Sequence, residues 1–253
     1  TGSEDYVITM YIEHKAAGPL GKPLTRAELD QVERLIFACE RFKNFLRARL
    51  KNLGFDVFCA DLYPQIFKLE GVENRQANLD EKLPYSDKSF DYIVCIEGLE
   101  HIENPANAIR EFSRLLKENG TLVVSVPNIM NIEERLKWLF NGYTSHFKPL
   151  SQQSLSDISR EFGGMEEIAL HVNPIGYSEL RYLLEKNGFE LLETTFDKKK
   201  KNSWLYLPIV GIVRLANLFI SKEKCQNRWT TELNSNEVLL GGNTLIFKAK
   251  KCS

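Results

Sequence analysis

Residues 83–105 of the 253-residue chain read LPYSDKSFDYIVCIEGLEHIENP, and this stretch is the most informative about the fold. Its centre, Phe90–Ile96, is almost continuously apolar, which predicts a strand buried on both faces. Leu83-Pro84 before it predicts a turn, because proline redirects the chain. After the strand, Glu97–Pro105 carries acids, a histidine and an asparagine. The stretch therefore predicts a turn, a buried strand and a polar loop at the carboxyl end of that strand.

Strands and helices alternate on both sides of this stretch. Phe55–Ala60 is predicted to be a strand ending on Asp61, Ala106–Lys117 a helix, and Thr121–Val126 a further buried strand. Such alternation of apolar strands with helices is typical of an open, mostly parallel sheet covered by helices. We therefore predict a doubly wound α/β fold.

The remaining elements follow the same patterns, with interruptions. Tyr6–Ile12 is predicted to be a short strand, and the spacing of apolar residues over 25–53 indicates a helix. The predicted helices and strands of the second half are Ile132–Phe140, Tyr177–Asn187, Phe189–Thr195 and Asn243–Lys250. We expect a single domain over residues 1–253, in which residues 1–53 have an uncertain role and residues 129–173 and 198–225 are insertions.

The composition is that of an ordinary globular protein, with 43% apolar and 26% charged residues. The 33 basic and 34 acidic residues leave a formal net charge of −1, which gives no general attraction to nucleic acid. The five cysteines form no C-x-x-C pair, so buried thiols in a reducing compartment are expected rather than disulfides or zinc. No signal peptide is visible, and a cytoplasmic location without a metal site is predicted.

Two groups of polar residues follow predicted strands, where open α/β sheets bind ligands, and a third, at Asn78-Leu79, precedes the Leu83-Pro84 turn. Asp61 is placed to accept hydrogen bonds from two vicinal ribose hydroxyls, or else it is a solvated loop residue or the cap of a helix that begins near Pro64. Asn78 and the backbone N–H of Leu79 could read an adenine edge. Glu100 and His101 could present a base near neutral pH, or else cap and orient the next helix.

Taken together, these elements resemble the class I S-adenosylmethionine-dependent methyltransferases of the methyltransferase-11/23 type. The matching text is GFDVFCADLYP, then NLDEKLPYSDKSFDYIVCIEGLEHIENPANAIREFSRLLKENGTLVVSVPN, and more weakly GYSELRYLLEKNGFELLE and GGNTLIFKAKK. The resemblance implies a Rossmann-like sheet of seven strands, mostly parallel. Its last strand, here Leu245–Lys250, would be antiparallel and inserted beside the fifth.

The resemblance also implies roles for individual residues and S-adenosylmethionine as the cofactor. Asp61 would bind the cofactor ribose, Asn78 and Leu79 would contact adenine, and Glu97 with the backbone through Leu99 would line the methionine end. If the acceptor must lose a proton, the candidate bases are His101, His146 and His171, the last two of which could also be structural. The two insertions would lie on the acceptor side.

One family feature is missing, the glycine-rich turn after the first strand, which lets the backbone approach the cofactor. Tyr6–Ile12 could be the first strand, with Glu13 as its acid and residues 16–21 as a rebuilt loop. Alternatively, Leu35–Cys39 is a degenerate first strand. In the third alternative a segment near Leu50–Lys51 is missing, and residues 25–50 are the helix that normally precedes the first strand.

Residues 198–220 combine four lysines with a 17-residue apolar run. The run is short and interrupted by Pro208 and Gly211, so a transmembrane helix is not predicted. It could rest on an anionic membrane surface, or pack as a helix on the sheet or over the acceptor pocket with its lysines in solvent. In the first case the protein would be membrane-associated without spanning the membrane.

Two classes of function remain open from the sequence. The first is S-adenosylmethionine-dependent methyl transfer to a small-molecule, sugar or lipid-linked acceptor. The second is a non-catalytic methyltransferase-like scaffold or binding protein that lacks a functional cofactor loop. A nicotinamide-dependent enzyme is disfavoured, because its phosphate-binding turn is also missing.

Overall fold

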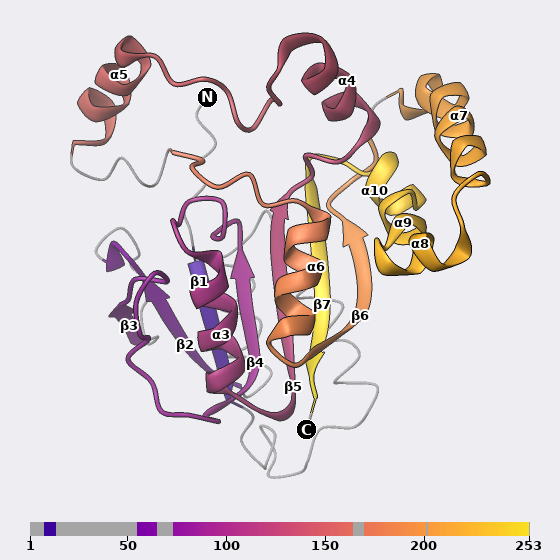
Figure 1. Cartoon of the computed structure of the whole chain (residues 1–253). Helices are drawn as coiled ribbons and strands as arrows, with labels where there is room; N and C mark the ends of the chain where they lie inside the picture. The colour runs from indigo at the N-terminus through magenta and orange to yellow at the C-terminus, as the bar shows by residue number, and fades with distance from the viewer. Residues whose placement is uncertain (1–7, 14–54, 65–72, 164–169, 201, 253) are drawn as a thin grey trace.

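The computed structural model describes residues 8–13, 55–64, 73–163, 170–200 and 202–252. In this part of the chain the strands lie in one sheet in the order β3-β2-β1-β4-β5-β7-β6 (Figure 1). Their bounds are β1 (Ile8–Glu13), β2 (Asp56–Asp61), β3 (Glu73–Gln76), β4 (Phe90–Ile96), β5 (Leu116–Pro127), β6 (Phe189–Phe196) and β7 (Thr244–Lys251).

The described helices fall into two groups. In Figure 1, α3 (Pro105–Leu115) and α6 (Tyr177–Lys186) lie against one face of the sheet. The others lie above or beside the sheet: α4 (Ile132–Asn141), α5 (Gln152–Phe162), η3 (Ser203–Tyr206), α7 (Leu207–Asn217), α8 (Lys222–Asn227), α9 (Thr230–Leu233) and α10 (Asn236–Leu239). The predicted Rossmann-like α/β fold is confirmed.

Strand directions follow the expected pattern except at β1. The pairs β2–β3 and β4–β5 are parallel, and β7 is antiparallel to both β5 and β6. However, β1 is antiparallel to β2 and to β4. Among the described neighbouring pairs, therefore, only two are parallel, although five strands point the same way. The mostly parallel sheet of the prediction holds for strand directions but not for strand pairings.

The reversal of β1 corrects one of the three explanations for the missing glycine turn. The predicted strand at Tyr6–Ile12 exists as β1 and occupies the slot between β2 and β4. Its register pairs Glu13 with Asp56, the first residue of β2, and Ile8 with Ile96, the last of β4. Glu13 is therefore at the edge opposite the carboxyl ends of β2 and β4, and cannot be the acid expected there. The alternatives that rest on residues 25–50 lie outside the described residues.

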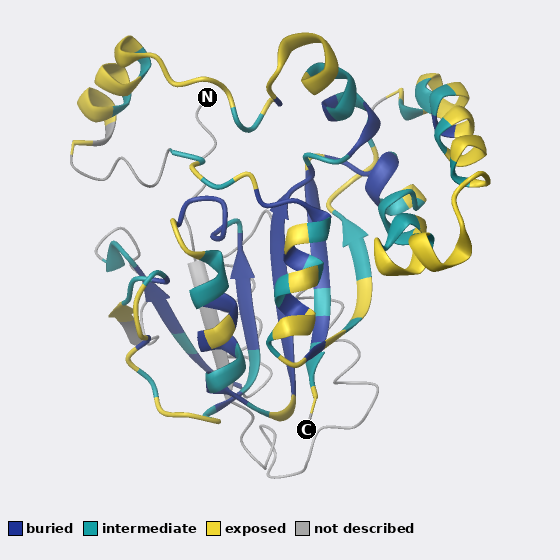
Figure 2. Cartoon of the chain, in the orientation of Figure 1, coloured by how far each residue is buried: buried dark blue, intermediate teal, exposed yellow. Residues whose placement is uncertain are grey.

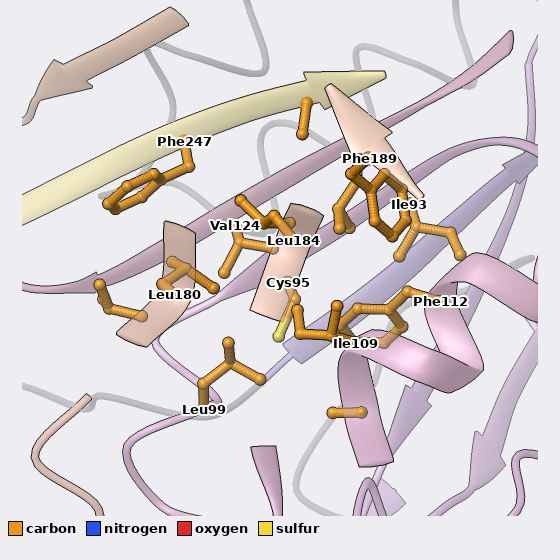
Figure 3. Packing of buried hydrophobic residues seen from close by; sticks show 14 of the residues in the cluster. Ile93, Cys95, Leu99, Ile109, Phe112, Val124, Leu180, Leu184, Phe189 and Phe247 are labelled. Carbon is orange, nitrogen blue, oxygen red and sulfur yellow. The ribbon is translucent and has the colours of Figure 1, made fainter. Parts of the chain in front are cut away.

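The main core lies between the sheet and the helices α3 and α6. Ile93, Phe112, Val124 and Leu184 are fully buried, and Figure 3 shows them packed together with Phe247 of β7. Figure 2 shows the same pattern as buried central strands under half-exposed helices. The apolar residues of β4 and β5 are thus buried as the sequence indicated.

Helix α3 is fixed at both ends by polar contacts. Pro105 occupies its first turn, and the Asn104 side chain accepts a hydrogen bond from the Asn107 N–H, which caps the helix. Near its other end, Glu111 is buried, accepts hydrogen bonds from Leu83 N–H and pairs with Arg114 at 2.6 Å. The helix is therefore tied to the Leu83-Pro84 turn as well as to the core.

The carboxyl group of Glu111 remains ionised in this position. Burial raises its pKa, but the hydrogen bonds from Arg114 and the Leu83 backbone outweigh burial, so the pKa lies below its ordinary value. The charge is thus favoured by the fold, and it stabilises the fold in return.

None of the helices within the described residues is long and apolar enough to cross a bilayer. Helix α7, which lies in the apolar run, spans 11 residues and leaves most of its apolar side chains exposed. Most of this run is therefore not buried on the sheet, and its packing over the acceptor pocket stays a prediction. Only Val210 is buried, in a small cluster with Ile132 of α4 and Leu239 of α10.

Candidate functional site

Asp61 lies at the carboxyl end of β2 and is 8% exposed. One carboxylate oxygen accepts a hydrogen bond from the Tyr63 N–H at 2.7 Å, and the low exposure contradicts the alternative of a solvated loop aspartate. The ribose role of Asp61 stays a prediction, and most of a helix that would begin near Pro64 lies outside the described residues.

Asn78 and Leu79 follow β3, directly beside the end of β2. The Ala77 N–H donates to the Asp61 carbonyl at 3.0 Å, which brings the two predicted cofactor loops together. The Asn78 side chain accepts from the Asp80 N–H at 3.0 Å and lies 3.4 Å from Glu81. The Leu79 side chain is buried in the core, so its backbone is the part that can reach a ligand.

Two residues absent from the sequence prediction hold this loop in place. The Asp80 carboxylate accepts from the backbone N–H groups of Glu103 and Asn104, at 3.2 and 2.7 Å. The Asn107 amide donates to the carbonyls of Leu79 and Glu81. These bonds join the loop after β3 to the start of α3. Sequence reasoning missed them because the partners are more than 20 residues apart.

Glu97 directly follows β4 and joins the ends of three strands. Its backbone has φ of 47°, in the left-handed region that non-glycine residues rarely adopt. Its N–H donates to the Ser125 hydroxyl at 3.0 Å, and its carboxylate accepts from the Thr244 hydroxyl at 2.8 Å. Strained backbone of this kind often marks a functional site.

Leu99 lies two residues further along, and its side chain is fully buried in the main core (Figure 3). Only its backbone can therefore serve a ligand. The segment from Glu97 to Leu99 is thus fixed at both ends. The Glu97 side chain is bonded to Thr244 of β7, and the Leu99 side chain is buried in the core.

The three histidines predicted as candidate bases lie close together, although they are up to 70 residues apart in the chain. The ring centroids of His101 and His171 are 4.6 Å apart and perpendicular, and those of His146 and His171 are 6.2 Å apart and nearly parallel. Phe147 packs on His171 at 5.6 Å. Three segments supply this cluster: the loop after β4, the connection between α4 and α5, and the segment before α6.

Backbone hydrogen bonds join two of these segments. Val172 and Asn173 both donate their N–H groups to the Glu100 carbonyl, at 2.9 and 3.0 Å. The His101 Nδ1 lies 3.0 Å from the Leu170 carbonyl oxygen. Helix α3 is capped by Asn104, so the alternative in which Glu100 and His101 cap that helix is wrong.

Electrostatics distinguish His146 from its neighbours. Burial lowers the pKa of the His146 imidazole below its ordinary value, and the carboxylate of Glu134 opposes that effect. Glu134 is itself buried and accepts a hydrogen bond from Ser145 N–H and pairs with Lys137. The neutral form of His146 is thus favoured near neutral pH, and neutral imidazole can accept a proton or bind a metal.

The fold and these loops define a Rossmann-like α/β protein with polar groups gathered at the carboxyl edge of its sheet. The model of a family described as "Methyltransferase domain" matches residues 40–194. The chain therefore belongs to the class I S-adenosylmethionine-dependent methyltransferase family. Asp61 at the end of β2 and Asn78 after β3 are the residues predicted to hold the ribose and adenine of that cofactor.

Curated relatives match part of the chain. A demethylmenaquinone methyltransferase of Listeria welshimeri is 31% identical over 145 residues, which is 52% of this chain and 59% of the relative. A ubiquinone biosynthesis O-methyltransferase of Psychrobacter cryohalolentis is 29% identical over 164 residues, 56% of this chain and 63% of the relative. The match thus spans about three fifths of the length of these relatives.

Among solved structures, a SAM-dependent methyltransferase from Archaeoglobus fulgidus aligns over 90% of this chain and 95% of its own. The sequence identity is 17% and the TM-score is 0.48.

Proposed function

We propose that the chain transfers the methyl group of S-adenosylmethionine to an apolar small-molecule acceptor. The observation that carries this proposal is the hydrogen bond of Ala77 N–H to the Asp61 carbonyl, which joins the two loops predicted to bind ribose and adenine. Asp61 would hold the ribose, Asn78 and the Leu79 backbone the adenine, and the backbone of Glu97 to Leu99 the methionine end.

The acceptor class follows from two observations. The relatives named above are a demethylmenaquinone methyltransferase and a ubiquinone biosynthesis O-methyltransferase, which suggests an apolar, quinone-like ring rather than a sugar. The helices above the carboxyl ends of β4 and β5 also carry exposed apolar side chains, including Trp138 and Phe140 of α4. An apolar acceptor would reach the site past such a surface.

The histidine cluster supplies the proton acceptor in this proposal. The acceptor oxygen or carbon forms a bond to the methyl carbon as the bond from that carbon to sulfur breaks, leaving S-adenosylhomocysteine. The proton that the methylated molecule loses passes to an imidazole of the cluster. The candidates are His146, His101 and His171. Most of the rate would come from positioning, since the sulfonium methyl is already electrophilic.

Calorimetric titration with S-adenosylhomocysteine tests the cofactor site. We expect binding by the wild type, and at least about tenfold weaker binding by Asp61→Ala, which removes hydrogen bonds between a charged group and the ribose. Asp157→Ala on α5 is the matched control and should bind as the wild type does. If the wild type does not bind, the cofactor site is refuted.

That negative result would favour the second candidate function, a non-catalytic methyltransferase-like binding protein. The specific observation in its favour is the reversed β1, which takes the place where the family has a parallel strand followed by the glycine turn. Binding of S-adenosylhomocysteine without turnover of any quinone-like acceptor would also fit a binding role.

Membrane contact through residues 198–220 is part of the proposal. The exposed apolar side chains of this region include Trp204, Ile212, Leu215, Leu218 and Phe219, with Phe219 87% exposed. Lys198 and Lys199 precede them, whereas Lys200 pairs with Glu133 at 2.8 Å and is occupied within the protein. An apolar helix beside lysines suits the surface of an anionic bilayer.

Flotation with phosphatidylserine-containing vesicles tests this contact. We expect the wild type to float, and the double variant Leu218→Ser/Phe219→Ser to remain in the soluble fraction. Tyr182→Ser on α6 removes an exposed aromatic residue elsewhere and should still float. Equal flotation of all three proteins, or of none, would refute the contact.

A further inference from the structure

We propose that Glu100, His101 and His171 bind a divalent transition-metal ion on the acceptor side of the site. One carboxylate oxygen and one nitrogen from each imidazole all lie within 4.8 Å of one another. Glu100 is fully buried, His101 is 8% exposed and His171 is half-buried. The proposed metal site differs from the sequence expectation of no metal site. It rests on the proposed function only for the role of the ion.

The orientation of His101 supports metal binding. Its Nδ1 faces the Leu170 carbonyl oxygen at 3.0 Å, and a carbonyl can only accept, so Nδ1 carries the proton. The lone pair is then on Nε2. Histidines that bind metals commonly donate their other ring N–H to a backbone carbonyl, which fixes the tautomer and the ring plane. His101 has this arrangement.

The backbone holds the second imidazole in place. The two bonds from Val172 and Asn173 to the Glu100 carbonyl fix the segment that carries His171 onto the loop that carries the other two ligands. The Asn173 side chain adds a bond to the Ile102 carbonyl at 3.4 Å. Because the two segments are tied together on both sides of His171, the three side chains are preorganised.

The ligand set limits the identity of the ion. Two imidazoles and one carboxylate suit zinc, iron or manganese, whereas magnesium and calcium prefer oxygen ligands alone. Ligands about 2.1 Å from a tetrahedral zinc are about 3.4 Å apart, so rotations that move ligand atoms by about 1 Å would close the site. Three protein ligands also leave a coordination position for the acceptor or a water molecule.

The ion would bind an acceptor oxygen in the open position. A bound metal lowers the pKa of a coordinated hydroxyl and fixes its position. The proton released by the acceptor would pass to His146 or to solvent, and the oxygen would then attack the methyl carbon. In this arrangement His101 and His171 are ligands, and His146 is the remaining imidazole of the cluster.

Titration of the metal-stripped full-length protein with Co²⁺, followed by visible absorption, tests the site. We expect one equivalent to produce d–d bands, and Zn²⁺ to displace it with the bands lost in proportion. Glu100→Gln and His171→Gln should each weaken Co²⁺ binding at least about 100-fold, the upper range for loss of a group that merely supports a ligand. Glu103→Gln, an exposed acid two residues beyond His101, should bind as the wild type does.

Because Glu100 is fully buried, Glu100→Gln could unfold the protein, so near-UV circular dichroism must first show that each variant is folded. His171 is only half-buried, so His171→Gln can test the site even if Glu100→Gln does not fold. The metal site would be overturned if the wild type gave no d–d bands. It would also be overturned if Glu100→Gln and His171→Gln bound Co²⁺ with the same bands and affinity as the wild type. Calorimetry with S-adenosylhomocysteine separates this result from the proposed function, because the cofactor site uses other residues. Cofactor binding without metal binding would refute the metal site alone.

Discussion

The core beneath α3 and the rim above the sheet, meaning the exposed apolar residues of α4 and of residues 207–220, contain the same kinds of residues. In the core these residues are buried, whereas on the rim they face solvent. In the core, Ile93, Phe112 and Leu122 are fully buried. The hydrogen bond from the Leu83 N–H to Glu111 holds the neighbouring loop against α3. On the rim, Trp138, Phe140 and Phe219 are between 58% and 87% exposed. Apolar residues in the core stabilise the fold, whereas large exposed apolar side chains are available to contact another molecule.

The largest effect is expected in the core. Phe112→Ala removes a fully buried ring from α3 and should lower the free energy of unfolding by about 3–5 kcal/mol. Denaturant titration at pH 7 measures it. Phe219→Ala on the rim removes the same ring and should change stability by less than about 0.5 kcal/mol. Equal losses in the two variants would contradict the comparison.

The second effect tests the buried pair at the base of α3. Glu111→Gln should destabilise the protein by roughly 1–3 kcal/mol at pH 7, since it leaves Arg114 and its partners without the carboxylate charge. The folded-state pKa of Glu111 is lowered, so its contribution is present above about pH 4.5 and is lost as the pH falls through the folded value.

Unfolding curves of the wild type and Glu111→Gln from pH 7 down to pH 3 test this dependence. The difference between them should shrink with acid. A difference that is constant across this range would mean that the charge of Glu111 contributes nothing and that only its shape matters.

A smaller effect is expected at the clamp formed by Asp80, whose carboxylate joins the loop after β3 to the start of α3. Asp80→Asn replaces one of the two oxygens that accept from Glu103 and Asn104, so it should cost about 1 kcal/mol and weaken S-adenosylhomocysteine binding roughly fivefold. Calorimetry measures the affinity, and Asp157→Asn on α5 serves as control. Unchanged affinity in Asp80→Asn would show that the clamp does not position the adenine loop.

The smallest effect is expected at the end of α4. Leu139 is 72% exposed, so Leu139→Ser should change the free energy of unfolding by less than about 0.5 kcal/mol. Its effect should appear instead in the KM for a quinone-like acceptor, measured with S-adenosylmethionine saturating. A loss of stability above about 1 kcal/mol would mean that this side chain is packed in solution.

Much of the sheet could be predicted from the sequence, because burial on both faces leaves a strong pattern. β4 was predicted with its observed bounds, and β2, β6 and β7 within a residue or so. β3 was missed because its sequence, Glu-Asn-Arg-Gln, is wholly polar. Helix α5 was missed for a related reason, since its apolar residues are few and partly exposed.

The direction of β1 and the assembly of the candidate site could not be predicted. A strand's residue pattern reads the same in either direction, so Ile8–Glu13 could be recognised as a strand but not oriented. The polar residues at strand ends were predicted individually, and their proximity to one another depends on loop paths. His101 meets the segment of His171 only because two backbone bonds fold residues 170–173 onto the loop after β4. No spacing rule connects residues so far apart.

These bonds to the Glu100 carbonyl also have a consequence for motion. Two N–H groups share one acceptor, so the amide protons of Val172 and Asn173 should exchange with solvent mainly when their contact with the loop after β4 opens. Opening one segment exposes the other, which makes the pair a single cooperative unit. Hydrogen exchange of the two amides should therefore report the opening of this contact.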